Sequence, residues 1–323
     1  MPVLRPGKKR RALRLFFATD IHGSEVCFRK FLAAAKVYGA DVLLLGGDFA
    51  GKGVVPVLRR GDLLAVTQDG QQVTAPAAEY DRLAGLVTRR GCYPVLMDDD
   101  ELAGLGADSA ALDALFKAEI TAQARRWCEL AAQRLDPAVR CIITPGNDDP
   151  VAADAIFASS GRVEFPALSV CEVGPFAMAS IGVVPTTPWN TERECPDDEL
   201  ARRIDELLAP HPADARWIFN FHSPPYASGL DDAPELDAGL RPVIRHGRPS
   251  VVPVGSRAVR DAIRSYQPVL ALHGHIHESP GVRRIGRSLC INPGSDYSAG
   301  VLCGALIDFA TDGTLMDYLL TTG

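Results

Sequence analysis

Short apolar runs, each followed by glycine or polar residues, recur along the chain and predict a series of buried strands. The first run, Leu13–Ala18, predicts one strand, and a second run at residues 41–45 predicts another. Between them, apolar residues at helical spacing from Glu25 to Tyr38, followed by Gly39, predict a helix. Strand, helix, strand is typical of a parallel α/β sheet, in which ligands bind beyond the carboxyl ends of the strands.

Residues 52–138 interrupt this rhythm. Alternating runs separated by polar turns predict a small β-meander, with strands at residues 54–58, 63–67 and 72–75. Helical stretches follow at residues 77–89 and 109–135, and the acidic run 98–101 between them is typical of a solvated turn or a helix start. The longer helix places six apolar residues roughly on one face: Leu112, Leu115, Phe116, Ile120, Trp127 and Leu130. We therefore expect an α+β insertion, or cap, at about 52–138 that carries no chemical motif and shapes access to the rest.

The strand pattern then returns. Further buried strands are predicted at residues 140–144, 177–183, 217–221, 269–272 and 302–309. Five of the predicted strands end in side chains that can bind a metal: Asp20, His22, Asp48, Asn147, His222, His275 and His277. This repeated placement is harder to obtain by chance than any one of the motifs.

These residue types suit transition-metal ions. Of the seven histidines in the chain, four fall in these motifs: His22, His222, His275 and His277. Imidazoles combined with carboxylates and one carboxamide form a ligand set for Mn²⁺, Fe, Ni²⁺ or Zn²⁺. Each motif alone has an ordinary explanation, such as a surface ion pair for Asp20 and His22 or a turn at a Gly-Asp pair. Their conjunction, in this order and each after a strand, favours a metal site.

The ordered motifs resemble those of the calcineurin-like metallophosphoesterases. They are Asp20-Ile-His22, Gly47-Asp48, Gly146-Asn147-Asp148-Asp149, His222 and Gly274-His275-Ile276-His277, and the resemblance extends from residue 14 to about 310. Gly-Asn-Asp-Asp, together with the turn at residues 292–295, is closest to a bacterial and archaeal branch of predicted phosphoesterases. The resemblance implies an α/β fold, a sandwich of two β-sheets flanked by helices.

The resemblance also implies a dinuclear site. One divalent ion would be held by Asp20, His22 and His277, and the other by Asn147, His222 and His275. Asp48 would bridge the two ions. The implied activity is hydrolysis of a small-molecule phosphate ester by attack of a metal-activated hydroxide.

Position 148 departs from the family's pattern, which has a histidine there that acts near the leaving group. An aspartate, with a reference pKa of about 3.9, is ionised at neutral pH and repels a monoester dianion more than a diester monoanion. Asp148 therefore favours phosphodiesters as substrates. Three alternatives stay open: Asp148 is protonated, it points away, or His273 supplies a proton instead of serving as a core histidine. Asp149 and Glu278 are candidate hydrogen-bond acceptors for metal-binding histidines, although Asp149 could equally cap a turn.

A polar loop at about 224–253 follows His222 and could form the rim of the site. Arg241, Arg245 or Arg248 could clamp a phosphate there. Tyr226 and Trp189 could stack on a nucleobase. A solvated basic loop and ordinary rim packing explain the same residues.

Composition narrows the remaining possibilities. The formal net charge of −6 argues against a general nucleic-acid surface, and no apolar run approaches the length of about 18 residues needed to span a membrane. Residues 1–13 are basic, with no long apolar run after them, and we expect a flexible arm rather than a signal peptide. The eight cysteines form no Cys-x-x-Cys pair, which favours free thiols in a reducing cytoplasm.

The competing functions are of three kinds. A phosphomonoesterase acting on nucleotides or phosphoproteins is the nearest alternative, and a nuclease is a narrower form of the diesterase. A metal-free, partner-binding scaffold of the same fold is the third, but all seven ligand positions bear competent side chains. The expected domain therefore covers residues 14–323 and is an active enzyme, with its oligomeric state left open.

Overall fold

The computed structural model of the protein describes residues 11–68, 70–212 and 214–323. Strand β1 (Arg11–Ala18) begins two residues before the predicted start at Leu13. Residues 1–10 of the expected N-terminal arm lie outside the described residues, and residues 11–13 belong to β1.

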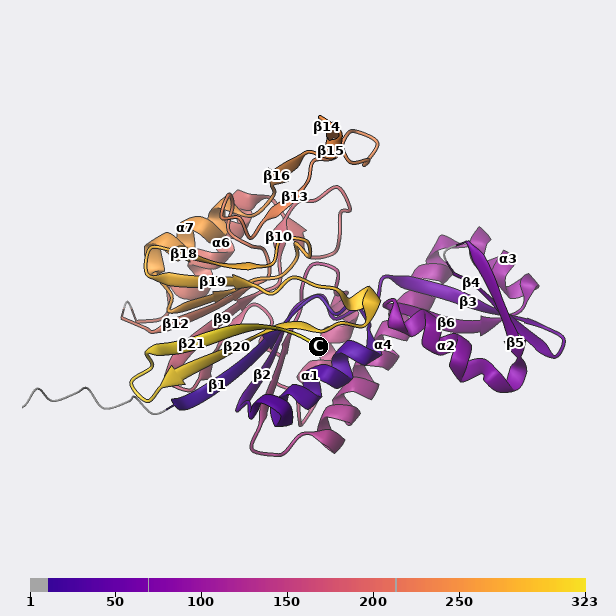
Figure 1. Ribbon diagram of the computed structural model, residues 1–323, viewed down its shortest axis with the longest axis horizontal. Helices are drawn as coiled ribbons and strands as arrows, with labels where there is room; N and C mark the ends of the chain where they lie inside the picture. Colours follow the sequence, from indigo (N-terminus) through magenta and orange to yellow (C-terminus); the bar gives the residue numbers. More distant parts are fainter. Residues whose placement is uncertain (1–10, 69, 213) are drawn as a thin grey trace, which may run out of the picture.

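The first sheet has the strand order β21-β20-β1-β2-β7 (Figure 1). Strand β1 pairs in parallel with β2 (Val42–Gly46), which pairs in parallel with β7 (Arg140–Thr144). On its other side β1 pairs antiparallel with β20 (Cys303–Ala310), which pairs with the edge strand β21 (Leu315–Thr322).

The second sheet has the order β18-β19-β17-β12-β9-β8. Its central strands β9 (Phe176–Ile181), β12 (Trp217–Phe221), β17 (Leu270–Leu272) and β19 (Ser288–Asn292) run parallel. The edge strands β8 (Ser169–Val173) and β18 (Gly281–Ile285) are antiparallel to their neighbours.

Alternating side chains place the two sheets face to face. In β1, Phe17 packs between the sheets with Ile218 and Leu272 of the second sheet, whereas Phe16 packs on the outer face. Helices α1 (Glu25–Tyr38), α4 (Ser109–Arg134) and α5 (Asp154–Ala158) cover that outer face. Helices α6 (Asp197–Leu208) and α7 (Arg257–Tyr266) cover the second sheet. The expected sandwich of two sheets flanked by helices is confirmed (Figure 1).

The remaining short elements connect these layers. They are η2 (Val151–Ala153), β10 (Val184–Pro185), β11 (Glu194–Cys195), β13 (Asp232–Pro234), β14 (Ile244–Arg245), β15 (Arg248–Pro249), β16 (Val251–Pro253) and η3 (Tyr297–Ala299). Among the described residues, no helix combines the length and apolar character needed to cross a bilayer.

The segment from β3 to α3 builds a second, smaller body that projects to one side in Figure 1. Its sheet has the order β5-β4-β3-β6, with β3 (Gly53–Arg60), β4 (Leu63–Gln68), β5 (Gln71–Pro76) and β6 (Cys92–Met97). η1 (Ala77–Glu79), α2 (Tyr80–Arg89) and α3 (Asp99–Ala107) accompany it. A separate apolar core fills this body: Val57, Leu64, Val66, Ala75, Leu83 and Val87.

Two details of this region differ from the sequence prediction. Strand β6 was not expected, and it pairs in parallel with β3, so that the meander becomes a four-stranded sheet. Leu112 is 44% exposed and lies outside the buried stripe of α4, because the first turns of this helix extend past the core. The acidic run is a helix start: Asp98 caps α3 in a reciprocal capping box with Glu101.

A buried hydrogen-bond chain joins the base of this second body to the loop after β1. The amide of Gly51 donates to Tyr93 Oη (2.7 Å), whose hydroxyl donates to Gln123 Oε1 (2.8 Å). Gln123 Nε2 then donates to the carbonyl of Gly23 (2.9 Å). Because Tyr93 and Gln123 are 2% and 4% exposed, water cannot easily replace these bonds.

Replacing Tyr93 by Phe should destabilise the protein by about 1–3 kcal/mol, because it strands the buried Gly51 amide and the Gln123 amide oxygen. Tyr318→Phe, at a residue 41% exposed on β21, is the matched control and should change stability by less than about 0.5 kcal/mol. Urea denaturation of both variants measures the difference. Equal midpoints would show that the chain of bonds adds nothing.

Candidate metal centre

The predicted ligands gather where parallel strands of both sheets end. Asp20 and His22 follow β1, Asp48 follows β2, and Asn147 follows β7. From the second sheet, His222 follows β12 directly, and His275 and His277 follow β17. Three groups of side chains have ligand atoms within 4.8 Å of one another: Asp20, His22 and His277; Asp48, His222 and His275; and His22, Asp48 and Asp148, which shares members with the other two.

The first group is held by short contacts around one carboxylate. Asp20 Oδ1 lies 3.3 Å from His277 Nε2, and the two Nε2 atoms of His22 and His277 are 3.0 Å apart. The backbone amide of His275 donates to both carboxylate oxygens of Asp20, at 3.0 and 3.1 Å.

Asp48 lies between the first two groups. Its Oδ2 is 3.3 Å from His222 Nε2 and 3.8 Å from His22 Nε2. His222 Nδ1 donates to the carbonyl of Gly46 at 3.1 Å, which leaves Nε2 available to a metal ion. Asp48 is thus the carboxylate that contacts side chains of both groups.

Asn147 is oriented by its neighbours so that its oxygen stays free. Its Nδ2 donates to Asp148 Oδ1 (3.0 Å) and to Thr191 Oγ1 (3.1 Å), and the Thr191 hydroxyl donates to Glu194 (2.7 Å). Oδ1 is buried and has no hydrogen-bond partner among the described residues. The sequence prediction missed Thr191 and Glu194. Thr191 lies 44 positions after Asn147, so no local pattern in the sequence signals this contact.

Some buried polar atoms of the cluster have no hydrogen-bond partner among the residues that the structure describes and are therefore available to bind a metal ion. Two predicted ligand atoms, His222 Nε2 and Asn147 Oδ1, are buried without a hydrogen-bond partner within the described part of the chain. Such atoms are rare in folded proteins because each forfeits its bonds to water. Imidazole nitrogens, carboxylates and a carboxamide oxygen are together a suitable ligand set for divalent transition metals.

The electrostatics of the cluster favour an added cation. Burial opposes protonation of His222, but the carboxylates of Asp48 and Asp20 outweigh it and raise its pKa to about 10. Burial also opposes ionisation of Asp20, yet His222 and His277 lower its pKa to about 2. The buried carboxylates are therefore stabilised by nearby positive charge, which a divalent ion would supply in place of a proton.

Four of the predicted ligands have left-handed backbone conformations. The φ angles are 53° at Asp20, 37° at His22, 51° at Asp48 and 68° at His275. For residues other than glycine this region costs on the order of 1–3 kcal/mol each and persists where the surroundings impose it. The turns that aim these side chains inward are thus maintained at an energetic cost.

Glycines in the motifs allow the strands' ends to approach. A Cβ atom at Gly146 would collide with the Asp48 carboxylate, and one at Gly274 would collide with that of Asp20. The turn at residues 292–295 supports the same loops: Ser295 Oγ donates to the Asp20 carbonyl (2.6 Å) and Asn292 Nδ2 to the Ile276 carbonyl (2.9 Å).

Asp148 lies at the edge of the cluster, not away from it. Its amide donates to Asp48 Oδ1 (3.0 Å), and its Oδ2 is 3.9 Å from His22 Nδ1. The same Oδ2 forms an ion pair with the ammonium of Lys52. Burial and Asp48 raise the pKa of Asp148, and Lys52 acts in the opposite direction. The sequence prediction did not single out Lys52, whose only local signal is its position four residues after Asp48.

His273 lies behind the cluster. It is fully buried, with Nδ1 2.8 Å from the Phe221 carbonyl and 3.1 Å from that of Ser223. Burial lowers its pKa to about 4. A neutral imidazole bonded to two backbone carbonyls orders the chain around His222.

Asp149 and Glu278 do not form the expected histidine contacts. Both oxygens of Asp149 accept backbone amides, from Ala50 and Gly146, each at 2.7 Å. This is the turn-capping alternative. Glu278 is exposed.

The rim residues lie in a protruding loop that includes β14 and β15 (Figure 1). Arg241 pairs with Asp237 at 3.2 Å and Arg245 with Glu235 at 2.9 Å, within the loop itself, and Arg248 is exposed. These pairs match the solvated-loop interpretation. Of the two aromatic candidates, Trp189 is 65% exposed. The guanidinium of Arg257 lies over the ring of Tyr226, with Arg257 Cζ 3.9 Å from the ring centroid.

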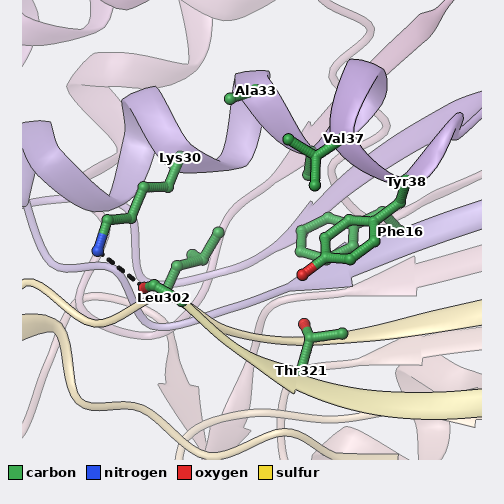
Figure 2. A pocket seen from close by; sticks show the side chains of 9 residues that line it. Phe16, Lys30, Ala33, Val37, Tyr38, Leu302 and Thr321 are labelled. Carbon is green, nitrogen blue, oxygen red and sulfur yellow. Dashed lines mark hydrogen bonds between the residues drawn. The ribbon is translucent and has the colours of Figure 1, made fainter.

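Two concavities lie elsewhere on the molecule. One of about 180 Å³ lies between α1 and the strands β1 and β21, and Figure 2 shows Phe16, Val37 and Tyr38 in its wall. The other, of about 490 Å³, is lined by Trp217, Tyr266 and neighbouring residues. Neither contains a predicted metal ligand.

No family model matches the sequence, and no curated protein matches it. Solved structures do share its fold. TT1561 of Thermus thermophilus is 16% identical over 96% of this chain and 98% of its own, with a TM-score of 0.52. A second solved chain is 14% identical over 95% of this chain and 98% of its own, with a TM-score of 0.56. At this identity the similarity establishes the fold alone.

Two looser matches are a 5'-nucleotidase precursor, also from Thermus thermophilus, and a protein described as a novel archaeal phosphodiesterase. They are 12% and 11% identical over 96% of this chain, and the alignments cover 54% and 100% of those proteins. Their TM-scores of 0.40 and 0.32 are too low to support an inference about this chain.

Chelator-treated protein dialysed against Mn²⁺ should take up about two equivalents, the number that a bridged pair of sites holds. Asp48→Asn should lower occupancy of both sites because its carboxylate contacts both groups. Asp261→Asn, at a side chain 73% exposed on α7, is the control and should leave uptake unchanged. Elemental analysis measures the content, and uptake of one equivalent or none by the unaltered protein would contradict a dinuclear centre.

Proposed function

We propose that the protein is a dinuclear, metal-dependent phosphoesterase, with a small-molecule phosphate ester as its substrate. The observation that carries this proposal is the meeting of two groups of metal-ligating side chains at one carboxylate, Asp48. In this assignment Asp20, His22 and His277 hold one ion, and His222, His275 and Asn147 hold the other. Mn²⁺, Ni²⁺, Fe or Zn²⁺ suits this donor set.

Divalent ions at this site would turn water into a nucleophile at neutral pH and offset charge on the phosphoryl oxygens. The residues of the chain contribute orientation and charge balance. Asp48 holds the two halves of the site together, and the neutral side chain of Asn147 adds no negative charge that would repel a phosphate. The left-handed turns at Asp20 and Asp48 fix their carboxylates before substrate arrives.

Phosphodiesters are the substrates that we favour. Asp148 has its two oxygens occupied by the Asn147 amide and the Lys52 ammonium, so it has no proton ready for a leaving group. Its carboxylate also disfavours a second negative charge on the substrate. Diesters with a leaving group that needs little protonation meet both conditions.

A phosphomonoesterase is the second candidate, and one observation favours it. Lys52 offsets the charge of Asp148, which weakens the repulsion expected from the sequence. A metal-free scaffold receives no such support, because the seven predicted ligands keep competent side chains.

The cysteines support a reducing compartment, and we propose the cytoplasm. All eight are free thiols, at Cys27, Cys92, Cys128, Cys141, Cys171, Cys195, Cys290 and Cys303. Disulfides are rare in such compartments and common outside them.

With Mn²⁺ or Ni²⁺ present, kcat/KM for a bis-aryl phosphate should exceed that for the matching mono-aryl phosphate. Release of the aryl alcohol measures both rates, with chelator-treated protein as the blank. His277→Ala should lower both by at least about a hundredfold if it removes a metal ligand, comparable to the loss of one strong electrostatic contact to the transition state. A higher rate with the monoester would select the phosphomonoesterase, and hydrolysis of neither ester would contradict the proposed function.

A further inference from the structure

We propose that Lys52 is the cation that binds the phosphoryl group of the substrate. Its ammonium is held by Asp148, and its backbone is positioned by the base of the inserted body. The inference rests on the proposed function and assigns a substrate contact to a residue outside the metal-binding motifs. It also gives the insertion a direct part in the site.

Lys52 reaches the open side of the cluster. Asp20, His22, Asp48 and His222 are each at most 2% exposed, so substrate cannot approach from their side. More accessible side chains beside them include His277 at 29%, Asp148 at 21% and Lys52 at 40%. The Lys52 ammonium is thus on the accessible side of the cluster, where a phosphate can reach it.

The Lys52 ammonium has N–H donors that are not used within the described part of the protein. Its ion pair is with Asp148 Oδ2, and no other hydrogen-bond partner of its side chain occurs among the described residues. A lysine ammonium has three N–H donors, and a phosphate supplies acceptors for the remaining two. Asp148 Oδ2 is itself 3.9 Å from His22 Nδ1, so the ammonium lies at most about two hydrogen-bond lengths from this predicted metal ligand.

The backbone holds Lys52 rigidly against the first metal-binding loop. Its amide donates to the carbonyl of Gly91 at 2.7 Å. A Cβ atom at Gly91 would collide with the carbonyl of His22, and one at Gly23 would be only 2.8 Å from Gly51 Cα. The segments before β3 and before β6 are thus packed on residues 22 and 23 without space for a side chain.

The other candidate cations are less well placed. Arg241 and Arg245 pair with acids of their own loop. Arg193, nearer the centre, donates to the Asp149 carbonyl and pairs with Asp154. Lys52 is bound to the one residue of the Gly-Asn-Asp-Asp motif that faces the open side.

The alternative role for Lys52 is to neutralise Asp148 without touching substrate, and a set of variants separates the two. Lys52→Met leaves an unpaired carboxylate, Asp148→Asn leaves an unpaired ammonium, and the double variant removes both charges. Lys36→Met, at an exposed lysine in the last turn of α1, is the matched control.

The readout is the affinity of the Mn²⁺-loaded protein for inorganic phosphate by titration calorimetry, with metal content by elemental analysis and kcat/KM for the bis-aryl phosphate alongside. Lys52→Met should weaken phosphate binding on the order of tenfold to a hundredfold, as loss of a charged hydrogen bond does. The double variant should recover part of this loss and remain at least about fivefold weaker than the unaltered protein, because the direct contact is missing. Lys36→Met should bind as the unaltered protein does, and metal content should stay the same throughout.

Phosphate affinity unchanged in Lys52→Met would overturn the proposal. Full recovery in the double variant would overturn it as well, since Lys52 would then only neutralise Asp148. Loss of metal from Lys52→Met would do so too, because the residue would act on the ions and not on substrate. Failure of the proposed function is distinguishable: the unaltered, metal-loaded protein would hydrolyse neither ester, whatever the variants do to phosphate binding.

Discussion

The burial of two carboxylates at the junction of two sheets is the constraint on which the rest of the structure depends. Asp20 and Asp48 are 1% and 2% exposed, and removal of an ion from water costs several kcal/mol unless nearby groups compensate. Histidines contributed by both sheets provide that compensation together with the backbone amides of His275 and Asp148. A divalent cation would complete the balance, and its binding would then depend on the integrity of the sandwich.

The sandwich makes this arrangement possible because parallel strands of both sheets end at the same edge. A register shift of one residue in β1 would turn Asp20 away and expose the face that carries Phe17. Asp20, His22 and Asp48 adopt left-handed backbone conformations within a few residues of the ends of β1 and β2. The inserted body is built on the same edge, so that its base and the metal-binding loops share one hydrogen-bond chain through Tyr93 and Gln123.

Local signals account for what the sequence predicts well. Helix α1 spans Glu25–Tyr38 as predicted, because Ser24 caps its start and Gly39 adopts the left-handed conformation at its end. Strand β7 also matches its predicted range, Arg140–Thr144. The ligand motifs are similarly local, since each is a few residues at one strand end.

Features that depend on pairing across the chain escape such prediction. Strand β21 has a mostly exposed, irregular pattern, and it exists because β20 provides a partner. Strand β6 contains Pro94 and lacks alternation, and its pairing with β3 defines it. The Lys52–Asp148 ion pair joins residues 96 positions apart, so position 148, read alone, predicts a bare negative charge that the fold in fact offsets. The arginines of the rim loop were predicted as phosphate ligands for the same reason. The acidic residues that pair with them come close only through the conformation of the loop, which the sequence does not reveal.

Anomalous X-ray diffraction from crystals grown with Mn²⁺ tests the dinuclear centre most directly. Two anomalous peaks about 3.5–4 Å apart, with the Asp48 carboxylate between them, are the predicted result. A single peak at this cluster, or none, would contradict the account.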